Sequence, residues 1–176
     1  ASDMGVMRPS LLPGLVEALH RNRDRQQDRV RLFEIGRVFA RGEDAPVETE
    51  RLAAVALGAA RAEQWAADDR SVDFYDAKGD LEAVSALSAT NDLRFEPGQR
   101  SWLHPGRSAE VFRGDVHLGC IGHLHPRLLK ALDLAHEVVV FELDVAPLAR
   151  RPVPQAGALS RFPSVRRDLA MVVPED

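Results

Sequence analysis

The sequence predicts an α+β fold, a mixed, largely antiparallel sheet with helices packed on it. The first observation is a helix-like pattern followed by a long strand-like run near the N-terminus. The second is a series of later segments, in 107–124 and 138–150, in which β-branched residues and alternation indicate further strands. A second helical segment separates the two groups of strands, so the order of elements favours α+β.

The first helix is predicted from Ser10, which stands where an N-cap is expected, with Pro13 in the first turn. Its apolar stripe consists of Leu11, Leu12, Leu15, Val16 and Leu19. The strand VRLFEIGRVF, residues 30–39, carries apolar residues on both faces, which predicts a central strand covered on both sides. We expect Phe33 and Ile35 to be buried together, and Leu32 to meet a second layer.

Later elements follow from similar signals. Residues 51–58 predict a short buried strand, and a helix is expected after Asp76 as N-cap, with Leu81, Val84 and Leu87 facing inward. A hairpin is predicted to turn at Gly114-Asp115, with Pro126 near the start of the next helix. The segment 138–150 predicts one more strand.

Composition limits the classes of function. The 176 residues carry a formal net charge of −4, whereas a free-standing nucleic-acid binder is expected to be strongly basic. The single cysteine, Cys120, excludes an intrachain disulfide and favours a reducing compartment. No apolar run is long enough to span a bilayer. We therefore expect a soluble, cytoplasmic chain without a membrane partner.

Several polar residues are candidates for chemistry. His123 and His125, two apart, could share a strand face and chelate a metal, but zinc needs a third ligand, and only His104 or Cys120 could supply it. Glu142 and Asp144 lie on one strand face and could form an acid/base pair. A polar face that meets solvent or a partner explains the same two carboxylates.

Basic residues raise a nucleic-acid alternative. Five arginines fall in one connector: Arg21, Arg23, Arg25, Arg29 and Arg31. Asp24 and Asp28 are interleaved, which is typical of a solvated face. Lys78 precedes a glycine, but Lys-Gly without the rest of a P-loop is a weak phosphate signal.

Motifs along the whole chain carry a family resemblance. They read MRPSLLPGLVEAL, LFEIGRVF, HPGRSA with GHLHP, and FPSVRRDL, in that order. With these motifs the chain resembles the class II aminoacyl-tRNA synthetase-like domain of the β subunit of bacterial phenylalanyl-tRNA synthetase. The resemblance implies a class II synthetase-type sheet for residues 1–150, a linker at 151–160, and the first strand of a truncated ferredoxin-like anticodon-binding domain at 161–176.

The same resemblance implies that this domain is catalytically silent. Catalytic relatives end the motif 2 strand in Phe-Arg-x-Glu, whereas this chain has Phe39, Ala40, Arg41 and Gly42. Ala40 cannot grip a phosphate, and Arg41 faces the other side of the strand. The glycines and arginine of motif 3 are absent from residues 138–150. We expect no catalytic, cofactor-binding or metal-binding residues here.

The full enzyme implied is an (αβ)₂ heterotetramer that joins phenylalanine to tRNA(Phe) with ATP and Mg²⁺, with its active site in the α subunit. The β-subunit domain would pair with that α subunit. Arg166 and Arg167 are candidate RNA contacts. Because motif 1 would lie upstream, we expect an apolar pairing patch at Met4, Val6 and Met7, and self-association of the fragment.

Two other functions stay open. A degenerate class II domain could bind a nucleotide or an amino acid through His123, His125, Glu142 and Asp144. An RNA-binding module could use the arginines at 21–31 together with Arg166 and Arg167.

Overall fold

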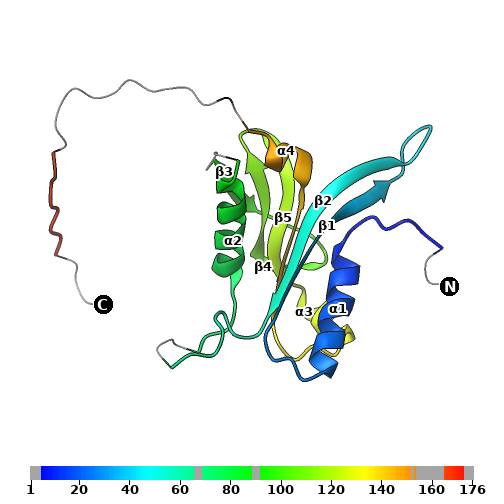
Figure 1. The fold of residues 1–176 in the computed structure, drawn as a ribbon, viewed down its shortest axis with the longest axis horizontal. Helices are drawn as coiled ribbons and strands as arrows, with labels where there is room; N and C mark the ends of the chain where they lie inside the picture. The colour runs from blue at the N-terminus through cyan, green and yellow to red at the C-terminus, as the bar shows by residue number, and fades with distance from the viewer. Residues whose placement is uncertain (1–4, 66–68, 89–91, 152, 154–164, 173–176) are drawn as a thin grey trace.

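The computed structural model describes residues 5–65, 69–88, 92–151, 153 and 165–172. It contains the α+β fold that the sequence predicts (Figure 1). The strands are β1 (Val30–Ala40), β2 (Val47–Leu57), β3 (Leu93–Pro97), β4 (Leu103–Arg113), β5 (Val116–Leu124) and β6 (Val138–Asp144). The helices are α1 (Leu12–Asp24), α2 (Phe74–Ala86), α3 (Pro126–Ala131) and α4 (Val145–Ala149).

The six strands form one sheet in the order β1-β2-β6-β5-β4-β3. Every pairing of the described strands is antiparallel. Strand β1 therefore lies at an edge, and the expectation that it is a central strand was wrong. Apolar residues on both faces of a strand do not reveal its position in a sheet, because strand order depends on contacts between distant segments.

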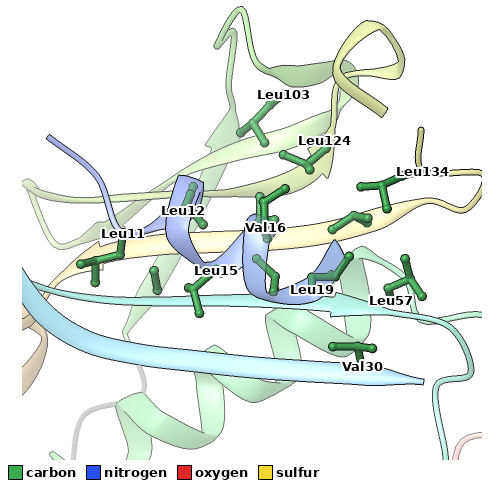
Figure 2. Packing of buried hydrophobic residues seen from close by; sticks show 14 of the residues in the cluster. Leu11, Leu12, Leu15, Val16, Leu19, Val30, Leu57, Leu103, Leu124 and Leu134 are labelled. Carbon is green, nitrogen blue, oxygen red and sulfur yellow. The ribbon is translucent and has the colours of Figure 1, made fainter. Parts of the chain in front are cut away.

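Helix α1 packs on one face of the sheet, over β1 and β2. The predicted stripe is buried: Leu11, Leu12, Leu15, Val16 and Leu19 all belong to one core cluster (Figure 2). The helix begins at Leu12 with Leu11 as N-cap, so Ser10 stands one residue further out than predicted. Ser10 still satisfies a first-turn donor, because its hydroxyl accepts a hydrogen bond from the Leu12 N–H at 3.1 Å.

Helix α2 packs against β5 and β6, on the opposite face of the sheet from α1 (Figure 1). Its N-cap is Asp73, and the prediction of Asp76 was wrong. Asp76 is the third helical residue and completes a capping box, in which its side chain accepts from the Asp73 N–H. Leu81 is fully buried as expected, but the expectation that Leu87 faces inward was wrong, since Leu87 is the C-cap of α2 and is exposed.

The hairpin and the third helix agree with the sequence. Strands β4 and β5 are joined at Gly114-Asp115, where Gly114 adopts a φ of 55° that glycine tolerates best. Pro126 opens α3, and the side chain of His125 caps this helix by accepting from the Arg127 N–H at 3.1 Å. None of the helices that the structure describes is long and apolar enough to cross a membrane.

The predicted strand near the C-terminus falls partly outside the described residues. Residues 165–172 carry no regular secondary structure, and Val165, Leu169, Met171 and Val172 are exposed. A single strand has no partner to complete its hydrogen bonds, so extended, exposed backbone is the expected state of such a segment. Most of the predicted linker, 151–160, also lies outside the described residues.

Candidate functional site

The two candidate acid/base carboxylates are bound by their own chain. Glu142 is 7% exposed. Its Oε1 accepts from the Leu11 N–H at 2.7 Å and from the Ser10 hydroxyl at 2.9 Å, while Oε2 accepts from Arg51 Nη1 at 2.9 Å. The Arg51 Nε donates to Asp144 at 2.9 Å. Both carboxylates are therefore ion-paired to one arginine, and Glu142 anchors the start of α1.

Glu142 belongs to a row of side chains that crosses the α1 face of the sheet. Cross-strand pairing places Glu34, Ala53, Glu142, Cys120, Glu110 and Glu96 at one level. Each of the four glutamates has its own arginine, namely Arg8, Arg51, Arg100 and Arg94. Burial raises the pKa of the Cys120 thiol to about 12, so this thiol stays protonated at neutral pH. The row is a set of paired charges without a free base.

The histidines do not form one site. His123 is buried in β5, where its Nδ1 lies 3.3 Å from Glu137 Oε2, and burial lowers its pKa. His125 lies beyond the strand as the cap of α3. Within the described ranges, no group of three His, Cys, Asp or Glu side chains could hold a metal ion. The structure therefore does not bring the proposed ligands together.

Most of the connector arginines have internal partners. Arg21 pairs with Glu17, Arg23 with Asp28, and Arg31 with Asp80. Arg29 donates to the Ala59 carbonyl oxygen at 3.2 Å. This agrees with the solvated-face interpretation. Lys78 pairs with Glu82 at 2.6 Å on the surface of α2, and its ammonium lies 5.1 Å from the centre of the Phe95 ring.

The largest departure from the sequence predictions is on β1. Phe33 is 74% exposed and Ile35 is 57% exposed, so the expectation that they are buried together was wrong. Leu32 meets a second layer as expected, because it packs against the α1 cluster. The alternation of β1 places its even-numbered residues under α1, so its odd-numbered residues face the other side of the sheet. Nothing in the described chain covers Phe33 and Ile35 there.

Geometry explains why this side is open. Six strands at about 4.8 Å spacing span roughly 24 Å, whereas one helix is about 10 Å wide. Helix α2 lies on β5 and β6, and α4 contacts β2, so β1 has no helix on this side among the described residues. A groove of about 410 Å³ separates α2 from β1. We call this the open face, and define it by Phe33, Ile35, Leu52, Ala54, Val84 and Leu87.

The predicted N-terminal patch is partly described. Val6 is 87% exposed and Met7 is 59% exposed, while Met4 lies outside the described residues. The next residue, Arg8, lies beside the edge of β1, because its carbonyl oxygen accepts from the Phe39 N–H at 2.9 Å. The apolar N-terminal residues therefore approach the same edge strand that carries the open face.

The residue that we expect at the motif 2 position, Ala40, lies at the end of β1. Ala40 is the last residue of the strand and pairs with Val47 of β2. The hairpin end of β1 and β2 projects from the rest of the sheet (Figure 1). A methyl group at this position offers no hydrogen-bond donor to a phosphate.

A family model described as the phenylalanyl tRNA synthetase beta chain CLM domain matches residues 1–145. The chain belongs to this family. It is 52% identical over its whole length to the phenylalanine–tRNA ligase beta subunit of Xanthomonas axonopodis pv. citri. It is 53% identical, over 99% of its length, to the subunit of the same name from Xylella fastidiosa. The chain spans 22% of each of these relatives.

Solved structures support the fold of this CLM domain. Two structures of pyrrolysyl-tRNA synthetase from Desulfitobacterium hafniense align with TM-scores of 0.51 and 0.54, at 21% and 19% identity. Each alignment covers 80% of this chain and 48% of the other. At this identity the likeness concerns the fold alone, and it confirms the class II synthetase-type sheet.

Sequence reasoning missed the partners of the carboxylates. Arg51 opens a predicted strand and Arg100 lies in a loop, and neither stands in a motif. Their roles depend on the register that brings Arg51 opposite Asp144 and Glu110 opposite Cys120. A weak signal was present in the polar residue Glu34, which stands between Phe33 and Ile35, but this alternation does not say which face is covered.

Proposed function

We propose that this chain is a catalytically silent domain of a phenylalanine–tRNA ligase β subunit, and that it pairs with the catalytic α subunit in an (αβ)₂ enzyme. The observation that carries the proposal is the open face, where Phe33 and Ile35 are exposed beside a groove of about 410 Å³. Exposed contiguous apolar surface of this kind is typical of a protein–protein contact. The names of the relatives support the identity of the enzyme.

The same proposal assigns the chemistry to the rest of the enzyme. ATP and Mg²⁺ act in the α subunit, and this domain takes no cofactor, because Ala40 and residues 138–150 lack the phosphate-binding side chains of the catalytic relatives. The enzyme attaches phenylalanine to tRNA(Phe) in the cytoplasm. The buried, protonated thiol of Cys120 is compatible with a reducing compartment.

Co-purification with the cognate α subunit tests the pairing. We expect the full-length β subunit with Phe33→Glu and Ile35→Glu to recover much less α subunit, because two carboxylates would be desolvated in the contact. Val116→Glu is the matched control, since Val116 is also half exposed but lies on β5, away from the open face. Equal recovery of the α subunit by all three proteins would refute the location of the contact.

Arg166 and Arg167 remain our candidates for tRNA contact, since both are exposed in the segment 165–172. We expect substitution of both by alanine to reduce the slope of log affinity against log salt by about two for tRNA(Phe), roughly one unit per lost phosphate contact. An unchanged slope in the full-length enzyme would remove them from the RNA interface.

A further inference from the structure

A second concavity lies on the α1 face of the sheet, opposite the open face. It is a cleft of about 1030 Å³ between α1, α3 and the strands beneath them. Its apolar walls include Val16, Trp102, Leu124, Leu128 and Leu132. Its floor contains Arg51, Arg100 and Glu142. Apolar walls with a few convergent polar groups are the usual composition of a small-molecule site.

The two floor arginines retain unused donors. Arg51 binds carboxylates through Nε and Nη1 at 2.9 Å, and Arg100 binds Glu110 through Nε and Nη2 at 2.7 Å. Neither Arg51 Nη2 nor Arg100 Nη1 donates to another of the described residues. The two side chains are 31% and 35% exposed, so these donors face water when the cleft is empty of ligand. A ligand that displaces this water has to supply hydrogen-bond acceptors.

The charges on the floor disfavour an ionic ligand. Two guanidinium groups, of Arg51 and Arg100, are already paired with three carboxylates, of Asp144, Glu142 and Glu110. A ligand carboxylate would add a fourth negative charge and lose its hydration. A ligand ammonium group cannot accept from the free Nη groups of Arg51 and Arg100, and the charges of these two guanidinium groups repel it. A neutral carbonyl oxygen accepts from the free Nη groups without either cost.

We propose that this cleft binds a small neutral molecule that combines an apolar body with a carbonyl acceptor, as in an aryl carboxamide. The carbonyl oxygen accepts from Arg51 and Arg100, and the apolar body lies against Trp102 and Leu128. This site is independent of the pairing function, because it lies on the opposite face of the sheet from Phe33 and Ile35.

Three probes of similar shape test the charge preference: phenylacetamide, phenylacetate and phenethylammonium. The chain has two tryptophans, so Trp65→Phe leaves Trp102 as the single fluorescent reporter in the cleft. We expect a saturable change in fluorescence with phenylacetamide near millimolar concentration, the order of affinity for about ten heavy atoms. Binding of either charged probe should be at least about tenfold weaker, a difference of about 1.4 kcal/mol. No saturable response to phenylacetamide, or equal binding of a charged probe, would overturn the proposal.

Filling the cleft tests the location. Leu128→Trp places a larger side chain in the cleft, and Leu87→Trp makes the same change on the opposite face. By saturation-transfer NMR, we expect Leu128→Trp to reduce the phenylacetamide signal at least about tenfold and Leu87→Trp to leave it unchanged. Leu132→Trp, also in the cleft, repeats the test if Leu128→Trp fails to fold. Equal signals from all variants would place the binding elsewhere and overturn the proposal.

Discussion

The carboxylate of Glu142 accepts a hydrogen bond from the backbone N–H of Leu11 at 2.7 Å, between residues 131 positions apart in the chain. The bond joins the start of α1 to β6, at the centre of the sheet. The first N–H groups of a helix have no partner within the helix, so a buried carboxylate at this point stabilises it. The residue that looked like a candidate acid or base is therefore an anchor for the first helix.

Removal of this charge should destabilise the fold. We expect Glu142→Gln to lower the free energy of unfolding by about 2–3 kcal/mol, because a buried, charge-assisted contact to Arg51 and to α1 is lost. Glu96→Gln is the matched control in the same row of glutamates, where the half-exposed pair with Arg94 contributes under about 1 kcal/mol. Urea unfolding measures both changes. Equal losses would contradict the anchoring role.

Two phenylalanines on the same face of the sheet should differ in their contribution to stability. Phe141 is 6% exposed and packs in the α2 cluster, whereas Phe33 is 74% exposed. We expect Phe141→Ala to cost about 3–5 kcal/mol by urea unfolding and Phe33→Ala under about 1 kcal/mol. A large cost for Phe33→Ala in the isolated chain would show that the open face is covered.

The stability of the chain should fall as the pH drops below about 6.5, through His123. Burial lowers the pKa of His123 in the folded state, so the unfolded chain takes up the proton first. Arg107, Glu137, His104 and Asp73 contribute to the field at this imidazole, and burial is the largest effect.

When the pH falls from 7 to 5, we expect the free energy of unfolding to decrease less for His123→Gln than for the parent chain. This pH range spans the ordinary histidine pKa of about 6.5. His136→Gln, at an exposed histidine, should follow the parent chain. Denaturant titrations at both pH values measure the difference. Parallel pH curves for all three proteins would exclude a role of His123.

ATP should not bind to this chain. We expect Ala40 to stand at the position of the phosphate-binding arginine of catalytic class II synthetases, and residues 138–150 lack the glycines and arginine expected of motif 3. Calorimetry with ATP and Mg²⁺ should show no saturable heat from micromolar to low-millimolar concentration, and no phenylalanine-dependent pyrophosphate exchange. An enzyme preparation that contains the α subunit serves as the positive control. Saturable heat from the chain alone would favour the degenerate, ligand-binding class II domain.

Local elements and the family could be predicted from the sequence because their signals are contained in short segments. The stripe from Leu11 to Leu19 and the turn at Gly114-Asp115 depend on residues close in the chain, and the structure confirms both. The N-cap of α2 was misplaced by three residues, because both Asp73 and Asp76 are suitable caps by type. The backbone conformation, which residue type alone does not give, makes Asp73 the N-cap.

Only the tertiary structure decided which apolar residues are covered. The alternation along β1 separates Leu32 from Phe33 and Ile35, but it does not say which side receives a helix. That depends on where α1, α2 and α4 lie across a six-stranded sheet whose edge strand β1 extends beyond α2 and α4. The partners of Glu142 were hidden for the same reason. The role of its charge depends on the register of β2 against β6 and on the contact of β6 with the start of α1, which is distant in the chain.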